Sequence, residues 1–227
     1  MLSPVRINRS SGTRPPLTLI CFSQLVPVKF LMPYLTKAEL LKMLVERRHK
    51  EVVENHLIAG VPFVFKESAK SYDKFVETLA GQFQTPKEDV SLIGSARIGF
   101  SINPDKFPAA FRPASDVDAV VVNAEKFDKA WFELSGIGRR RFGMERKVQI
   151  AYQEHRENNV FFGFIVPDRL PGIVTLSPIW FFGLQLVGRQ VREVSGRKIN
   201  GRLYRTWEHV RAHQLYSLES IEAKFAK

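Results

Sequence analysis

Hydrophobic positions recur at helical intervals in the first third of the chain. Thr36 and Glu39 have the spacing of a capping box, and the apolar residues that follow predict one amphipathic helix over residues 37–57. A second apolar stripe with helical spacing begins at Ser71 and ends before Pro86. Together these patterns indicate a helical lead-in over residues 36–85.

Beyond residue 85 the pattern alternates between strand-like and helix-like segments. Short apolar runs predict buried strands at residues 90–93, 119–122 and 160–166. Helical spacing predicts helices at residues 124–134, 145–157 and 207–225. Two runs around Gly196, residues 189–195 and 198–206, predict a β-hairpin.

This mixture predicts an α/β (α+β) fold in which a small mixed β-sheet is flanked by helices, because strands and helices do not alternate strictly. The length of 227 residues suits one domain with a small appendage. We expect a single domain over residues 32–227, with its sheet core at 90–206 and a closing helix at 207–225.

The N-terminal 35 residues contain no Asp or Glu, and a proline-punctuated uncharged run covers residues 15–28. A signal peptide needs a cleaner apolar stretch and a small-residue cleavage site, whereas a transit peptide fits loosely. A third interpretation is favoured, in which residues 1–31 are an extension upstream of a start at Met32. We expect this extension to be poorly ordered.

Residues 170–188 are uncharged, but two prolines and several polar residues argue against a membrane-spanning helix. A buried loop and helix is the expectation, with no membrane partner. One cysteine, Cys21, excludes an intrachain disulfide and fits a reducing compartment, so we expect a cytoplasmic protein.

The chain is basic, with 34 Lys and Arg against 23 Asp and Glu and a net charge of +11. Such a surplus favours polyanionic partners, namely nucleic acids or nucleotides. Because the charge is scattered, it is equally typical of an ordinary basic soluble protein.

Two acidic residues, Asp116 and Asp118, stand at the head of an apolar strand. Alternate strand residues point to one face, about 6.6 Å apart along the strand, so the two carboxylates can share Mg²⁺. Asp-x-Asp is also ordinary turn chemistry at strand starts. A second pair, Gly94 and Ser95, ends the strand at 90–93, where a glycine lets a phosphate approach backbone N–H groups and the serine hydroxyl.

A strand ending in Leu-Ile-Gly-Ser (92–95), followed by Ser-Asp-Val-Asp-Ala-Val (115–120), resembles the nucleotidyltransferase superfamily related to DNA polymerase beta. The resemblance implies that Gly94 and Ser95, with Ser115, position the nucleotide phosphates. It implies that Asp116 and Asp118 bind Mg²⁺ or Mn²⁺ and act in catalysis. Members of this superfamily usually carry a third carboxylate on a later strand.

Glu193, in the run 191–194, is the expected third carboxylate, and Asp168 and Glu145 are weaker candidates. Arg205 lies in a segment that interleaves basic and aromatic residues, which suits phosphate contact and stacking on a nucleotide. The same residues suit a structural role, with Arg205 paired to Glu208.

Three functions therefore compete. The first is a metal-dependent nucleotidyltransferase that transfers a nucleoside monophosphate from an NTP substrate to an unknown acceptor, such as a nucleic acid or a protein. The second is a catalytically inactive protein of the same fold, acting as an antitoxin or a defence regulator. The third is a basic nucleic-acid-binding module. The sequence leaves the oligomeric state open.

Overall fold

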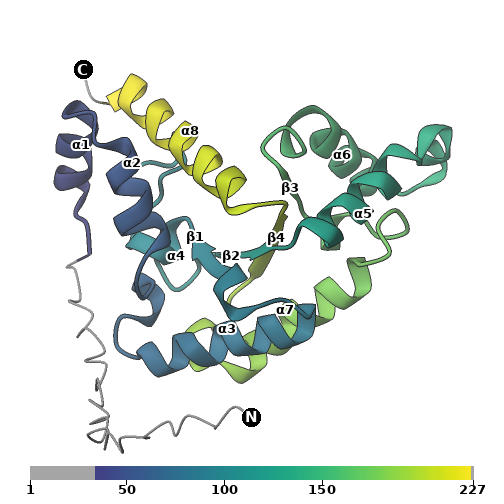
Figure 1. Ribbon diagram of the computed structural model, residues 1–227, viewed down its shortest axis with the longest axis horizontal. Coiled ribbons are helices and arrows are strands. Elements are labelled where there is room, and N and C mark those ends of the chain that lie inside the picture. The colour runs from purple at the N-terminus through teal and green to yellow at the C-terminus, as the bar shows by residue number, and fades with distance from the viewer. Residues whose placement is uncertain (1–33, 226–227) are drawn as a thin grey trace, which may run out of the picture. The chain divides into compact units, whose positions relative to one another are not determined.

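The computed structural model describes residues 34–225 (Figure 1). Its four strands are β1 (Val90–Ile93), β2 (Val117–Val122), β3 (Phe164–Ile165) and β4 (Ile199–Tyr204). Its α-helices are α1 (Lys37–Val45), α2 (His49–Val52), α3 (Ala69–Phe83), α4 (Ser95–Ile98), α5 (Ala124–Ser135), α6 (Arg146–Glu154), α7 (Ser177–Gln190) and α8 (Trp207–Phe225). The expected poor order of residues 1–31 concerns a segment outside the described residues.

The four strands form one open mixed sheet in the order β1-β2-β4-β3. β1 and β3 are antiparallel to their neighbours, whereas β2 and β4 run parallel. The register places Asp118 of β2 between Ile93 of β1 and Asn200 of β4. The α/β class with a small mixed sheet is therefore confirmed.

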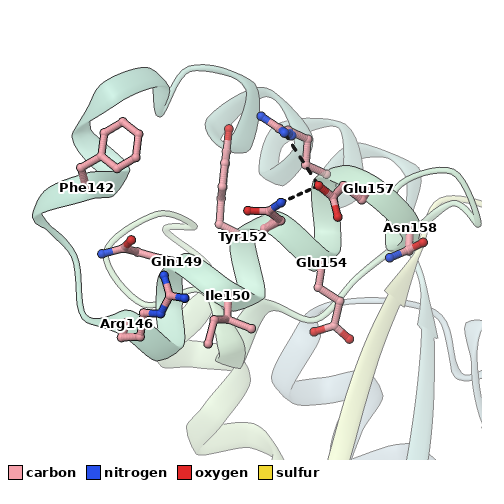
Figure 2. A pocket seen from close by; sticks show the side chains of 10 residues that line it. Phe142, Arg146, Gln149, Ile150, Tyr152, Glu154, Glu157 and Asn158 are labelled. Atoms are coloured by element: carbon pink, nitrogen blue, oxygen red, sulfur yellow. Dashed lines mark hydrogen bonds and ion pairs between the residues drawn. The ribbon is translucent and has the colours of Figure 1, made fainter.

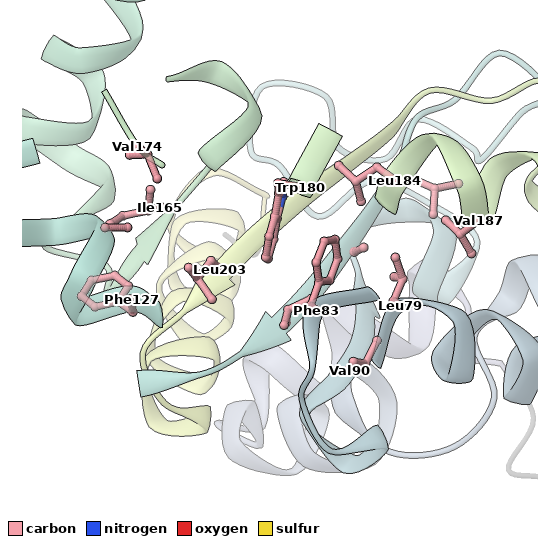
Figure 3. Packing of buried hydrophobic residues seen from close by; sticks show 14 of the residues in the cluster. Leu79, Phe83, Val90, Phe127, Ile165, Val174, Trp180, Leu184, Val187 and Leu203 are labelled. Carbon is pink, nitrogen blue, oxygen red and sulfur yellow. The ribbon is translucent and has the colours of Figure 1, made fainter. Parts of the chain in front are cut away.

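Helices cover both faces of the sheet, with α8 on one side and α3 and α7 on the other (Figure 1). On the α3–α7 side the ring of Phe83 stacks on Trp180 with centroids 4.1 Å apart (Figure 3). The indole Nε1 of Trp180 donates a hydrogen bond to the Gly201 carbonyl at 3.2 Å. Gly201 allows this approach, because a Cβ there would lie 2.4 Å from the indole nitrogen.

The alternation along β2 determines which side chains face α8. Val117, Ala119 and Val121 belong to the core on the α3–α7 side. Val120 and Val122 pack on the opposite face with Val210 of α8. Asp118 shares the parity of Val120, so strand geometry directs it to the α8 face.

Several predicted elements are confirmed. β1 and α8 have the predicted bounds, and Thr36 and Glu39 form both hydrogen bonds of the capping box. Residues 170–188 contain a loop and most of α7 rather than a spanning segment. Among residues 34–225, no helix is both long enough and apolar enough to cross a membrane.

The helix predicted over residues 37–57 is wrong as a single element. α1 ends at Val45, Arg47 adopts a positive φ of 59°, and α2 and a π-helical segment, Val53–Ile58, follow. The apolar positions on both sides of the turn keep helical spacing, so the pattern gives no sign of the break. The second helix begins at Ala69, two residues before the predicted Ser71, because Ser68 caps it.

The predicted hairpin around Gly196 is also wrong. Its first half contains the end of α7 and a short 3₁₀ segment, Arg192–Val194, while β4 pairs with β2 and β3. Val191 and Val194 are both buried, and a separation of three residues places both on one side of a helical turn. The strand predicted at 160–166 is only two residues long, since a π-helical segment, His155–Asn159, and a turn precede it.

Candidate functional site

An open pocket of about 870 Å³ lies where the ends of β1, β2 and β4 meet α8 and the loop of residues 101–110. Its lining includes five of the residues that the sequence singles out, namely Gly94, Ser95, Ser115, Asp116 and Asp118. Residues from both predicted motifs therefore line the same cavity.

The two aspartates are held side by side by a residue of the neighbouring strand. The Nδ2 group of Asn200 donates to Asp116 Oδ2 at 3.3 Å and to Asp118 Oδ1 at 3.4 Å. Asn200 reaches both because β4 runs parallel to β2 with Asn200 opposite Asp118. One amide thus contacts both carboxylates at the mouth of the pocket.

Two cations compensate the carboxylates from a greater distance. Lys198 Nζ lies 4.0 Å from Asp116 Oδ2, and Arg202 Nη2 lies 3.8 Å from Asp118 Oδ1. The guanidinium of Arg202 also lies over the Phe164 ring, 5.1 Å from its centroid. Two negative charges therefore have two positive charges nearby, of which only Arg202 lines the pocket.

The turn after β1 brings backbone close to Asp118. Gly94 has φ of 71°, which side-chain-bearing residues rarely adopt, and a Cβ there would lie 3.1 Å from Asp118 Oδ2. Both constraints require glycine at this position. Ser95 then begins α4 at the pocket wall.

The side chain of Arg97 connects α4 to the segment that follows the π-helical turn. Its side chain is 2% exposed and donates to the carbonyl oxygens of Ile58, Ala59 and Gly60. Those carbonyls lie at the end of the π-helical segment Val53–Ile58, so the guanidinium satisfies acceptors that the helix leaves open. Burial lowers the pKa of Arg97 from its ordinary value. The turn at Gly94 is thereby tied to the helical lead-in.

Arg197 holds the segment that leads into Asp116, and the sequence gives no local sign of this. Its Nη1 donates to the carbonyls of Arg112 at 2.6 Å, Pro113 at 2.7 Å and Ser115 at 3.2 Å. Its guanidinium also lies over Phe111, 4.5 Å from the ring centroid. The Ser115 hydroxyl closes the same turn by accepting from the Arg112 N–H at 2.9 Å.

The α8 wall of the pocket contains a partly buried histidine. His213 is stacked against Phe162 and Phe164, and its Nδ1 is hydrogen-bonded to the Tyr204 hydroxyl at 2.7 Å. Burial, together with the nearby positive charge of Arg202, lowers the pKa of His213 to about 4. The imidazole is therefore neutral at pH 7.

Two predicted site residues lie elsewhere. Glu193 accepts a hydrogen bond from the Ser71 hydroxyl at 2.9 Å, at the start of α3, and does not line the pocket. Arg205 pairs with Asp128 of α5 at 2.7 Å, rather than with Glu208, and also lies outside the pocket lining.

The weaker third-carboxylate candidates are not at the pocket either. Asp168 lies in a short 3₁₀ segment after β3, where burial raises its pKa, and Glu145 pairs with Lys147 at 2.9 Å. Within residues 34–225 no three His, Cys, Asp or Glu side chains cluster in a way that could hold a metal ion. On the strand next to Asp118, the opposite position holds the neutral Asn200.

A second pocket of about 510 Å³ lies along α6 (Figure 2). Gln153 and Glu157 face each other there, with Gln153 Nε2 donating to Glu157 Oε1 at 2.6 Å. Arg156 lies 3.9 Å from the same oxygen. These contacts join neighbouring residues of one helical stretch. None of the residues from the Gly-Ser and Asp-x-Asp motifs lines this pocket.

The chemistry of the donor set at the first pocket fits a hard divalent cation. Carboxylate oxygens are the ligands that Mg²⁺ and Mn²⁺ prefer, and Mg²⁺ commonly uses one or two carboxylates together with waters and phosphate oxygens. Asp116 and Asp118 supply two such carboxylates on one face. The site is therefore suited to a cation that arrives with a phosphate-bearing ligand.

No family model, no curated protein and no solved structure matches the chain.

Proposed function

We propose that the protein is a metal-dependent nucleotidyltransferase, which transfers a nucleoside monophosphate from an NTP to an acceptor such as a nucleic acid or a protein. The observation that carries this proposal is the position of Asp116 and Asp118, side by side in a pocket that Gly94 and Ser95 also line. Two motifs separated by about twenty residues of loop thus converge on one cavity.

The volume of the pocket and the charge of the whole chain both suit a nucleotide ligand. Its volume of about 870 Å³ lies within the range of about 300–1,000 Å³ typical of small-molecule sites. The net charge of +11 favours the approach of polyanions.

Each residue has a distinct task in this proposal. Asp116 and Asp118 would hold Mg²⁺ or Mn²⁺, and the bound cation would supply stabilisation of negative charge on the attacking and leaving oxygens. Gly94 leaves space for the phosphates, and Ser95 donates its hydroxyl to them. Ser115 shapes the turn that delivers Asp116.

The test is pyrophosphate release from each labelled NTP with Mg²⁺ or Mn²⁺, in the presence of a cell extract that supplies acceptors. Asp116→Asn and Asp118→Asn should abolish release, whereas Asp128→Asn, an exposed aspartate outside the pocket, should not. Release that persists in both pocket variants would contradict the proposal.

A second candidate is nucleotide binding without transfer, as in an antitoxin or a defence regulator. Asn200 favours it, because a neutral amide lies beside Asp118 on the neighbouring strand and contacts both aspartates. The two candidates differ in one measurement. If wild type binds Mg²⁺ and NTP without releasing pyrophosphate, and Asn200→Asp gains release, the second candidate is supported.

A further inference from the structure

The face of β4 that meets the aspartates carries two cations. Lys198 immediately precedes β4, and with Asn200 and Arg202 it occupies alternate positions, which share one face in extended chain. The parallel register sets Asn200 opposite Asp118 and Arg202 opposite Val120, one step further into the sheet. A positive charge therefore flanks Asn200 on each side.

Arg202 is the better placed of the two cations for contact with a ligand. It lines the pocket, its side chain is 28% exposed, and its guanidinium is oriented by the Phe164 ring. Lys198 is 73% exposed and lies outside the lining, at the rim. Stacking against an aromatic ring limits the orientations of the guanidinium before any ligand binds.

Neither cation makes a close ion pair with its aspartate. Charge-assisted N–H···O bonds are about 2.7–2.9 Å long, whereas the contacts here are 3.8 Å for Arg202 and 4.0 Å for Lys198. Elsewhere in the molecule arginines reach this distance, for example Arg205 to Asp128 at 2.7 Å. Arg202 thus lies near Asp118 without binding it directly.

We propose that Arg202 binds the phosphate chain of the nucleotide, with Lys198 contributing long-range attraction from the rim. The inference rests on the proposed function, since the phosphates are those of the NTP that the aspartates bind with a metal. A planar guanidinium with several N–H donors matches the geometry of phosphate oxygens. A cation held by Asp118 would repel the guanidinium, and phosphate oxygens would then offer the guanidinium an acceptor in place of the carboxylate.

The test uses inorganic tripolyphosphate, which has the phosphate chain without the nucleoside, together with excess Mg²⁺ in calorimetry. Arg202→Met keeps an apolar contact with Phe164 but removes the donors, so affinity should fall about tenfold or more. Arg202→Lys should recover only part of this loss, because it restores charge without the planar fork. Arg205→Met is the matched control and should leave affinity unchanged.

Melting curves establish that each variant is folded, and Arg202→Lys carries the test if Arg202→Met does not fold. Equal affinity of wild type and the folded Arg202 variants would overturn the inference, as would an equal loss in Arg205→Met. Measuring pyrophosphate release in parallel distinguishes a failure of this inference from a failure of the proposed function. If pyrophosphate release requires both aspartates but the affinity for tripolyphosphate is unchanged in the Arg202 variants, only the inference about Arg202 is contradicted. If the affinity for tripolyphosphate falls in the Arg202 variants but no pyrophosphate is released, only the proposed nucleotidyl transfer is contradicted.

Discussion

The pocket at the sheet edge and the pocket along α6 differ in what fixes their charged groups. In the first, Asp118 and Asn200 are neighbours because two parallel strands are in register, and the chain between them is about eighty residues long. In the second, Gln153 and Glu157 are neighbours because they are four residues apart in one helical stretch.

This difference affects how precisely a ligand can be held. Strand ends in a buried sheet keep their carboxylates in place whether or not a ligand is present, and a preorganised site binds at a lower entropic cost. Helical neighbours on an exposed surface are screened by solvent and contribute little. The pocket at the sheet edge is therefore the better candidate for binding a ligand in a fixed geometry.

The largest effect is expected from the paired aspartates. Asp116→Asn and Asp118→Asn should each abolish pyrophosphate release, and the double variant should be scarcely worse, because the two carboxylates act as one unit. Glu157→Gln, a carboxylate of the α6 pocket, is the matched control and should retain release. Additive losses in the double variant would mean that the aspartates act separately.

The next effect concerns the backbone beside Asp118. Gly94→Ala combines a positive φ of 71° with a Cβ only 3.1 Å from Asp118 Oδ2, and it should cost about 3 kcal/mol or more in unfolding free energy. Gly172→Ala has a similar φ of 74° but no atom within 4 Å of the new Cβ, so it should cost about 1–2 kcal/mol. Urea denaturation measures both. Equal losses would show that Asp118 does not restrict the turn.

A third effect follows from the partly buried imidazole of His213 in the pocket wall. His213 titrates near pH 4 when folded and near 6.5 when exposed, so the unfolded chain binds more protons between these values. Stability from this residue is therefore fully present above about pH 7 and is lost as the pH falls, by about 2 kcal/mol between pH 7 and 5. None of the described residues that line the α6 pocket is a histidine.

Urea unfolding at both pH values checks this, with His213→Phe as the variant. The phenyl ring keeps the stacking but cannot be protonated, so the difference between the two pH values should shrink by about 2 kcal/mol. The lost bond to Tyr204 lowers stability equally at both values. His155, whose pKa burial also lowers, keeps its own contribution in the variant. If the difference in unfolding free energy between pH 7 and pH 5 is the same in His213→Phe as in wild type, another group is responsible for the pH dependence.

The smallest effect is expected at Arg197, which positions the segment before Asp116. Arg197→Met should weaken Mg²⁺–NTP binding about fivefold, on the order of 1 kcal/mol, because the carbonyls of residues 112–115 lose their donor. Arg192→Met, at an arginine that is 93% exposed, is the control. Unchanged affinity in Arg197→Met would mean that the turn holds without the guanidinium.

Local patterns in the sequence predicted the elements that depend on local forces. The capping box of α1, the apolar runs of β1 and β2, and the shared face of Asp116 and Asp118 follow from spacing over a few residues. The turn at Gly94 and Ser95 also follows from a local pattern, an apolar strand that ends in Gly-Ser, and both residues line the same pocket as the aspartates.

The contributions of β4 were not predictable in this way. Asn200, Arg202 and Arg197 reach the site only because β4 pairs in parallel with β2, and no local pattern reports a pairing between strands so far apart in the chain. The predicted hairpin assigned β4 to the wrong partner, and Glu193 was then placed on a strand that does not exist. The buried pair Val191 and Val194 had helical spacing, which is the signal that the strand prediction overlooked.

The most direct test of the account is the melting temperature of wild type, Asp116→Asn and Asp118→Asn with Mg²⁺ and NTP, alone and combined. Ligand that binds only the folded state raises the melting temperature, by an amount set by its concentration relative to Kd. We expect a rise in wild type that needs both Mg²⁺ and NTP, and no rise in either variant. The absence of a metal-dependent rise in wild type, with both variants less stable than wild type without ligand, would make the two aspartates a structural turn and contradict the account.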